Sequence, residues 1–229
     1  DFIPKIDFLK KVIPYFKDEK IAMVQTRWSH LNENFNLLTK MQAFGLNAHF
    51  TVEQTGRRKA KSFINFNGTA GIWRKESILA VGGWHHDTLT EDLDLSYRTQ
   101  LNGWKFEYLE SVESPAELPI TLQAVKSQQF RWNKGTAETI RKNISKVIQS
   151  DLALNHKTRA VLHLLNSTVF LFIFMAALLS VPLVFIKNEY PHLKTIFDFG
   201  SVFLVGFIAI GIFYWFAVRT SQKHPFTYF

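Results

Sequence analysis

Acidic side chains crowd one short stretch of the sequence. Four carboxylates lie within the eight residues from position 87 to position 94: Asp87, Glu91, Asp92 and Asp94. A carboxylate held rigidly where a strand passes into a helix can accept a proton from a hydroxyl group within hydrogen-bond reach. The tripeptide Thr90-Glu91-Asp92 therefore offers a candidate general base.

The same residues have a purely structural interpretation. Thr88 followed three residues later by Glu91 fits a capping box, in which a hydroxyl and a carboxylate satisfy backbone N–H groups at a helix start. Acidic residues in a first turn also offset the positive end of the helix dipole. The pattern alone leaves both interpretations open.

A second chemically capable group lies downstream in "QQFRW". Helical spacing places Gln128, Arg131 and Trp132 on one face. An arginine suits a phosphate leaving group, an indole offers a flat surface to a sugar ring, and an amide hydrogen-bonds hydroxyls. The structural alternative is a core tryptophan with an arginine stem packed beside it.

Alternating strand and helix signals surround these groups. The apolar run at 20–28 predicts a strand, and 104–110 predicts another. Helices are expected at 32–50, at 91–103 with Gly103 as the C-cap, and from 117 to about 148 in two pieces broken near Gly135. This alternation favours an α/β domain.

The last third of the chain has membrane character. Val169–Ile186 and Phe199–Val218 are 18 and 20 residues without a charge, close to the length that crosses a bilayer as a helix. Only four of the 27 Lys and Arg follow Arg159, so the positive-inside rule places the N-terminal part in the cytoplasm. We therefore expect contact with a lipid bilayer.

Other kinds of site are less well supported. His85 and His86 are adjacent, so they point apart in regular structure, and no further ligands follow at zinc spacing. The basic run 56–61 resembles no nucleic-acid-binding module, so no nucleic-acid partner is expected. The chain has no cysteine, which leaves no basis for a redox argument.

The two motifs and their order resemble a known family. The "TED" of 90–92, a Gln-x-x-Arg-Trp that begins 36 residues after Asp92, and trailing apolar spans look like the processive family-2 glycosyltransferases. These include cellulose synthase, the cellulose synthase-like mannan and glucan synthases and the poly-N-acetylglucosamine synthases. "FNFNGTAGIWRKES" and "TEDLDLSYRTQLNGWKF" resemble the mannan-synthase branch, and the resemblance covers about residues 1–150.

This resemblance implies an α/β fold of the GT-A type (Rossmann-like), a nucleotide-diphosphate sugar donor, Mg²⁺ or Mn²⁺, and inversion at the anomeric carbon. It makes Asp92 the general base, with Glu91 and Thr90 shaping the acceptor pocket. It assigns the donor diphosphate to Gln128 and Arg131. It assigns acceptor binding to an indole and a loop: Trp132, Phe66, Asn67, Gly68 and Thr69.

The chain departs from the family pattern at its start. The family has an upstream Asp for the nucleotide and an Asp-x-Asp for the metal, and neither is complete here. The opening "DFIP" resembles the end of the second motif, which makes Asp1 the predicted metal ligand. We therefore expect a fragment that lacks half its donor site and is inactive alone.

The expected organisation is a catalytic part, an amphipathic interfacial segment and two spans. The boundaries are 1–132 (catalytic), 133–159 (interfacial), 160–186 (span), 187–198 (extracytoplasmic loop), 199–218 (span) and 219–229 (cytoplasmic start of a tail). The expected location is the inner (plasma) membrane, as a multi-pass protein with its catalytic domain in the cytoplasm.

The predicted function is transfer of a hexosyl unit to a growing β-linked polysaccharide acceptor, coupled to export. The sequence identifies neither the sugar nor any export subunit. One alternative is a lipid glycosyltransferase of the ceramide glucosyltransferase type. An alternative of another class is a non-enzymatic membrane protein with a cytoplasmic α/β domain.

Overall fold

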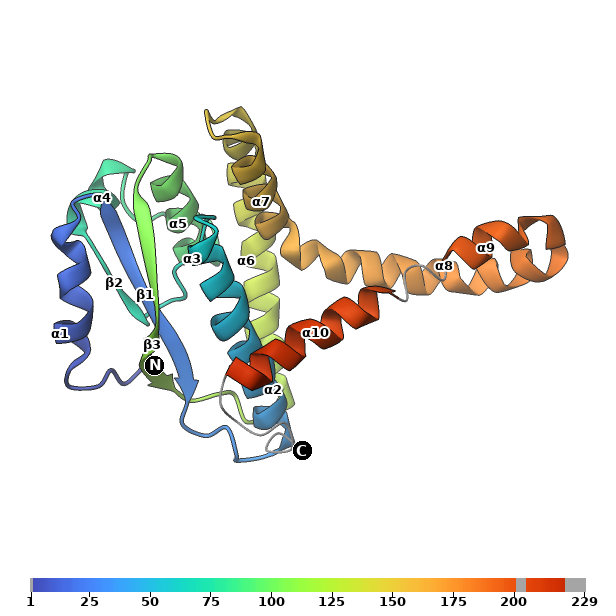
Figure 1. Ribbon diagram of the computed structural model, residues 1–229, viewed down its shortest axis with the longest axis horizontal. Coiled ribbons are helices and arrows are strands. Elements are labelled where there is room, and N and C mark those ends of the chain that lie inside the picture. The colour runs from blue at the N-terminus through green and yellow to red at the C-terminus, as the bar shows by residue number, and fades with distance from the viewer. Residues whose placement is uncertain (1, 201–204, 221–229) are drawn as a thin grey trace.

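A three-stranded sheet forms the centre of the protein. The computed structural model describes residues 2–200 and 205–220. β1 (Ile21–His30) lies between β2 (Gly71–Trp73) and β3 (Lys105–Ala116), antiparallel to the first and parallel to the second (Figure 1). Both predicted strands are therefore confirmed, although β3 runs further than expected.

β1 is central because it is apolar on both faces. Every residue from Ile21 to Thr26 is buried, as expected for a strand covered on both sides. One face packs on α1 (Phe8–Val12) and the 3₁₀ turn Ile13–Lys17. This side of the core contains Phe8, Val12, Ile21, Val24, Leu109 and Val112.

Helices cover the other face of the sheet. α2 (Leu37–Ala48) passes into the π-helical turn η2 (His49–Gln54) and then α3 (Thr55–Lys59). The core beneath them contains Phe50, Ile64 and Tyr108. The short α4 (Lys75–Ala80) follows β2 and ends in a glycine pair with positive φ.

Three helices form a further layer beside the sheet. α5 (Glu91–Leu101), α6 (Leu122–Gln149) and α7 (Leu154–Leu164) enclose an apolar cluster. The predicted break of the third helical region near Gly135 is wrong, because α6 is continuous over 28 residues. The predicted boundary between 132 and 133 lies inside this helix. The buried cluster contains Phe63, Leu93, Tyr97, Val147, Ala160 and Leu164.

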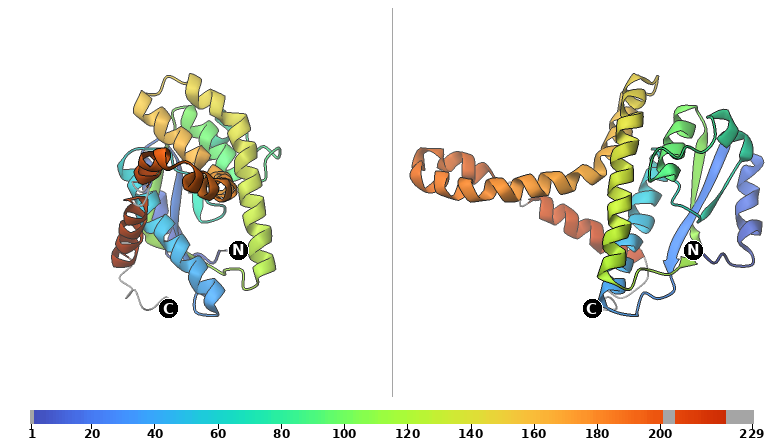
Figure 2. Two further views of the ribbon diagram at one scale, coloured as in Figure 1. Left: turned by 90° about the vertical axis from the view of Figure 1, so that its right-hand side faces the viewer. Right: turned by 180° about the vertical axis from the view of Figure 1, so that it is seen from behind.

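The C-terminal helices project from this body. After the 3₁₀ turn Leu165–Thr168, α8 (Val169–Glu189) extends outward; the turn Pro191–Leu193 and α9 (Lys194–Gly200) reverse the chain, and α10 (Val205–Thr220) returns (Figures 1 and 2). The Tyr214 ring stacks on Phe44 of α2 at 4.8 Å. The hairpin therefore leaves and rejoins the same side of the body.

Two helical regions are long and apolar enough to cross a membrane. Leu154–Lys187 has 34 residues and Lys194–Arg219 has 26, and almost none of their most apolar surface is buried in the protein. They contain both predicted spans and begin earlier in each case. Surfaces this apolar need a non-aqueous environment, which is consistent with membrane association.

Candidate active site

The start of α5 differs from the capping-box expectation. Thr90, not Thr88, is the N-cap residue, and its side chain makes no capping hydrogen bond. The Thr90 hydroxyl lies 3.3 Å from the hydroxyl of Thr139 on α6. Glu91 is exposed to solvent. The carboxylates are therefore not used in the predicted cap, and the Thr90 hydroxyl serves a contact between helices.

Asp92 lies in the first turn of α5 with its carboxyl group held by backbone donors. The Leu93 N–H donates to Oδ1 at 2.8 Å and the Gly68 N–H donates to Oδ2 at 3.0 Å. Burial, with a contribution from the charge of Glu91, raises the pKa of Asp92 to about 6. At neutral pH this gives an oriented carboxylate that is more basic than an ordinary aspartate.

The loop before β2 provides one of these donors. Gly68 has φ of +67°, a conformation that favours glycine and that turns its N–H toward Asp92. The Phe66 N–H donates to the Ser96 hydroxyl at 2.9 Å, and the Phe66 ring is buried edge-on against Trp73. Phe66 therefore anchors the loop from within the core and exposes little surface to an acceptor.

α6 crosses the start of α5 at Gly135. A Cβ atom at this position would lie 2.6 Å from the Thr90 backbone nitrogen and 2.8 Å from the Leu89 carbonyl carbon. The Leu89 N–H donates to the Glu138 carboxylate at 2.8 Å, which holds the same crossing. The Gln-x-x-Arg-Trp segment ends three residues before Gly135, so Trp132 lies about one helical turn along α6 from this crossing.

An aromatic pair connects this segment with the Asn67 loop. The Trp132 ring lies 6.4 Å from that of Trp28 at the end of β1, and Trp28 Nε1 donates to the Asn67 carbonyl at 3.2 Å. The Phe2 ring packs on Trp28 at 4.9 Å. The sequence analysis missed Trp28, whose only signal was an indole at the polar end of a buried strand.

Three further predicted site residues lie wholly or partly at the surface. Arg131 and Thr69 are exposed and Gln128 is half-buried. Within residues 2–200 and 205–220, the side chains of Gln128 and Arg131 have no hydrogen-bond partner, so they are available to a ligand. The predicted metal ligand, Asp1, lies outside the described residues.

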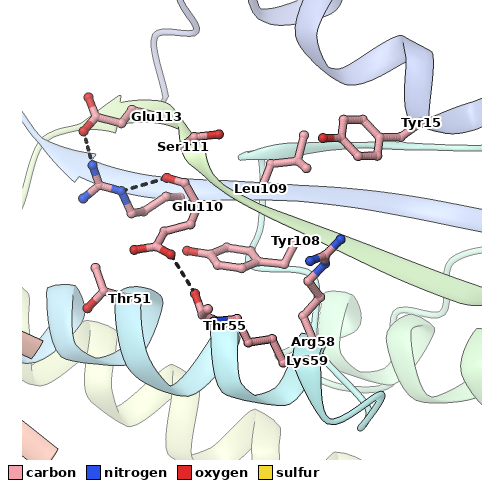
Figure 3. Close-up of a pocket in the computed structure, with 11 residues that line it drawn as sticks. Tyr15, Thr51, Thr55, Arg58, Lys59, Tyr108, Leu109, Glu110, Ser111 and Glu113 are labelled. Carbon is pink, nitrogen blue, oxygen red and sulfur yellow. Dashed lines mark hydrogen bonds and ion pairs between the residues drawn. The ribbon is translucent and has the colours of Figure 1, made fainter. Parts of the chain in front are cut away.

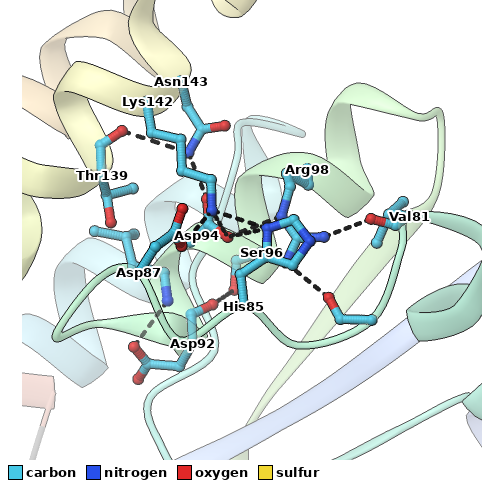
Figure 4. Close-up of polar contacts among 12 residues, drawn as sticks. Val81, His85, Asp87, Asp92, Asp94, Ser96, Arg98, Thr139, Lys142 and Asn143 are labelled. Carbon is cyan, nitrogen blue, oxygen red and sulfur yellow. Dashed lines mark hydrogen bonds and ion pairs between the residues drawn. The ribbon is translucent and has the colours of Figure 1, made fainter.

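A cluster of potential metal ligands lies deeper along the contact between α5 and α6. Atoms of His85, Asp87 and Asp94 lie within 4.8 Å of one another. The Lys142 ammonium contacts all three, at 2.9 Å, 2.7 Å and 3.0 Å (Figure 4). It occupies the position that a cation would take. The cluster is therefore an ion-pair network around the buried Asp94 with its own counter-ion, and it does not fit a divalent metal.

This network predicts a large stability effect for Lys142→Met. Asp94 is fully buried, and removing one of its cations leaves its charge less compensated, at a cost of about 3–5 kcal/mol. The measurement is thermal unfolding of the detergent-solubilised protein. Lys134→Met on the same helix is the control, because its ion pair with Glu138 is a surface contact worth about 0–1 kcal/mol. Equal effects of both substitutions would contradict the assignment.

A separate hollow of about 710 Å³ lies beside β3 and α3 (Figure 3). Two of the cations that line it are already paired, Arg27 with Glu113 and Arg58 with Glu107, so these two offer little free charge to a diphosphate. The buried Tyr108 hydroxyl in its wall has no hydrogen-bond partner among the described residues. No described site residue predicted from the sequence lines this hollow.

Comparison with known proteins places these features in a family. The model described as "Glycosyl transferase family group 2" matches residues 3–218. The chain is 44% identical over 151 residues to glucomannan 4-beta-mannosyltransferase 2 of Arabidopsis thaliana, which covers 66% of this chain and 28% of that protein. It is 35% identical over 221 residues to the probable glucomannan 4-beta-mannosyltransferase 3 of the same plant, covering 91% of the chain and 39% of the relative.

A solved structure shares the fold. A mannosyltransferase from Pyrobaculum calidifontis, in complex with GDP-Man and Mn²⁺, superposes with a TM-score of 0.55 at 12% identity, covering 96% of this chain and 59% of that chain. The α/β fold is therefore of the GT-A glycosyltransferase type, as predicted. The chain spans well under half the length of the two Arabidopsis relatives.

Proposed function

This chain belongs to glycosyl transferase family group 2, and we propose that it is part of an inverting mannosyltransferase that extends a β-1,4-linked mannan or glucomannan. Family membership and the glucomannan mannosyltransferase relatives support a hexosyl transfer. The observation that supports the proposed site is the crossing at Gly135, where α6 meets the start of α5 three residues after Trp132.

Asp92 is the proposed general base. Its half-buried carboxylate, oriented by two backbone N–H groups, accepts the proton of the acceptor sugar hydroxyl. That hydroxyl oxygen forms a bond to the anomeric carbon while the bond to the donor diphosphate breaks. The configuration inverts in this single displacement, so no covalent enzyme intermediate forms.

The exposed ends of the site receive the two substrates. Arg131 and Gln128, which have free polar groups, bind the diphosphate of the donor, for which GDP-mannose is our proposal. Trp132 and Trp28 offer indole faces to the acceptor sugar beside the Asn67 loop. Arg131 stabilises the charge that develops on the leaving diphosphate.

The implied Mg²⁺ or Mn²⁺ finds no fitting site among the described residues. The cluster of carboxylates at Asp94 is filled by Lys142. Asp1 remains the predicted ligand, and its chain neighbour Phe2 packs on Trp28. When bound, such an ion would neutralise charge on the leaving diphosphate.

The acid limb of the pH profile follows from Asp92. Because the base must be ionised and its pKa is raised to about 6, kcat/KM should fall about tenfold per unit as the pH decreases below 6. Initial rates of polymer synthesis by the full-length protein across a buffer series measure this. A limb with its midpoint near 4, the ordinary value for aspartate, would contradict the buried base.

We propose the plasma membrane as the location, with the catalytic body in the cytoplasm. The hairpin of α8 and α10 would cross the bilayer twice and contribute to a path for export of the polymer. The basic residues before α8 are consistent with this orientation.

The test of the function is a donor panel. Membranes that contain the full-length protein are incubated with labelled GDP-mannose, GDP-glucose, UDP-glucose and UDP-N-acetylglucosamine. Label from GDP-mannose should enter an insoluble product that β-mannanase degrades. Label that appears only in a single-sugar glycolipid would instead support the lipid glycosyltransferase alternative.

A further inference from the structure

One face of α6 is buried along four successive turns. Its buried residues recur every four positions: Gly135, Thr139, Asn143 and Val147. Such a stripe faces a single neighbour, and here the first three members contact α5 or the residue before it. The face is small and polar rather than aliphatic over these three members.

The most specific contact on this stripe joins Asn143 to Asp94. The Asn143 Nδ2 donates to Asp94 Oδ1 at 2.8 Å. The other oxygen of Asp94 accepts from Arg98 Nε at 2.8 Å and from Lys142 Nζ at 3.0 Å. Figure 4 shows these donors converging on the carboxylate. Both oxygens of a fully buried anion are therefore satisfied, and two of these three donors come from α6.

Arg98 connects the buried Asp94 carboxylate with the turn that follows α4. Its guanidinium donates to the carbonyl oxygens of Val81 and Gly83, at 2.5 Å and 2.8 Å. The turn after α4, α5 and α6 thus share one buried carboxylate. Asp92 lies two residues earlier on the same helix. A displacement of α6 relative to α5 at Asp94 would therefore also change the position of α6 relative to Asp92.

A shift of α6 along its axis would break the hydrogen bond between Asn143 and Asp94 and would cause a steric clash at the position of Gly135. A slide of one turn would remove Asn143 from Asp94 and leave a buried acceptor without its partner, which is costly. The same slide would bring Arg131 or Thr139 to the place of Gly135, where even a Cβ atom meets the Thr90 backbone at 2.6 Å. The Asn143–Asp94 hydrogen bond and the close approach at Gly135 therefore allow only one position of α6 along α5.

We propose that Asp94 and Asn143 are positioning residues, which set the register of α6 and so hold the Gln128–Trp132 segment at the working distance from Asp92. The effect that we expect this register to have on catalysis rests on the proposed function. Neither residue is assigned a contact with the substrate, and Lys142 and Arg98 supply the counter-charge to Asp94.

The first test exchanges the two side chains. Asn143→Asp places a second carboxylate against Asp94, and Asp94→Asn removes the anion that the donors share. In the full-length protein each single substitution should lower kcat for mannosyl transfer from GDP-mannose by about 10²-fold. The double variant, Asp94→Asn with Asn143→Asp, restores one amide and one carboxylate, and it should recover most of the lost rate.

The second test measures register without activity. Thr90→Cys with Thr139→Cys replaces two hydroxyls that lie 3.3 Å apart, so the two thiols would face each other across the contact between α5 and α6. Mild oxidation should cross-link this pair rapidly, judged against both single-cysteine variants. Adding Asn143→Asp should lower the cross-linking rate about tenfold, and adding both exchanged residues should restore it.

The outcomes distinguish the positioning role of Asp94 and Asn143 from the proposed mannosyl transfer. Unchanged cross-linking with Asn143→Asp, or no recovery of rate in the exchanged double variant, would overturn the positioning role. If the wild-type protein transfers no mannose but cross-linking responds as expected, the register inference stands and the proposed function fails.

Discussion

Asp92→Asn should lower kcat for glycan synthesis by about 10²–10⁴-fold, the contribution typical of a positioned general base. The amide has nearly the same volume as the carboxylate, but its lone pairs cannot take the hydroxyl proton. One of its polar atoms can still accept a backbone N–H, from either Gly68 or Leu93. The initial rate of labelled mannose incorporation by the full-length protein measures this.

The control for this substitution removes a carboxylate elsewhere. Glu76→Gln, in the exposed first turn of α4, also removes one negative charge but does so away from the site. It should leave the rate of glycan synthesis at the wild-type value. The thermal midpoint of Asp92→Asn should stay close to that of wild type, because burial already disfavours the ionised form. If Asp92→Asn lost activity only because it unfolds, its thermal midpoint would be clearly lower than that of the wild type.

Gly135→Ala should disrupt the crossing of α5 and α6. The added Cβ would lie within 2.8 Å of backbone atoms of both Leu89 and Thr90, which cannot rotate away as a side-chain end could. α6 must therefore move off α5, at a cost of about 1–3 kcal/mol in the free energy of unfolding. Because the same helix carries Trp132, we expect kcat to fall about 10²-fold as well.

Gly45→Ala is the matched control for this methyl group. Gly45 lies inside α2, and a Cβ there meets no atom within 4 Å. Alanine is the better helix former, so this substitution should raise the free energy of unfolding by about 0.5–1 kcal/mol. Denaturant unfolding of both variants checks the pair, and a similar loss at the two positions would show that packing at Gly135 is not special.

Local patterns were sufficient to predict much of the α/β body. The continuous apolar run of β1 and the helix from Glu91 to Leu101 depend on neighbours in the chain, and both are present. The break predicted at Gly135 is wrong for a physical reason. The low helix propensity of one glycine is outweighed by the packing that only glycine permits against Thr90.

The four neighbouring carboxylates show where sequence reasoning stops. Within one stretch they look alike, yet Asp92 is held by backbone donors and Asp94 by Arg98, Asn143 and Lys142. Asn143 and Lys142 lie almost fifty residues downstream on α6, Gly68 lies in the loop before β2, and only the folded chain brings them to these carboxylates.

The aromatic contact at the site has the same origin. Trp28 and Trp132 are separated by most of the catalytic body in sequence, and their rings meet because β1 ends beside α6. No periodicity in either segment could indicate the pairing.

The central claim is that Asp92 and Arg131 act on one transition state. A double-mutant cycle of kcat for mannosyl transfer, with Asp92→Asn, Arg131→Ala and both together in the full-length protein, tests it most directly. We expect each single variant to be severely impaired and the double variant to be little worse than the poorer single one. Losses that multiply independently, or wild-type synthesis by either single variant, would contradict the account.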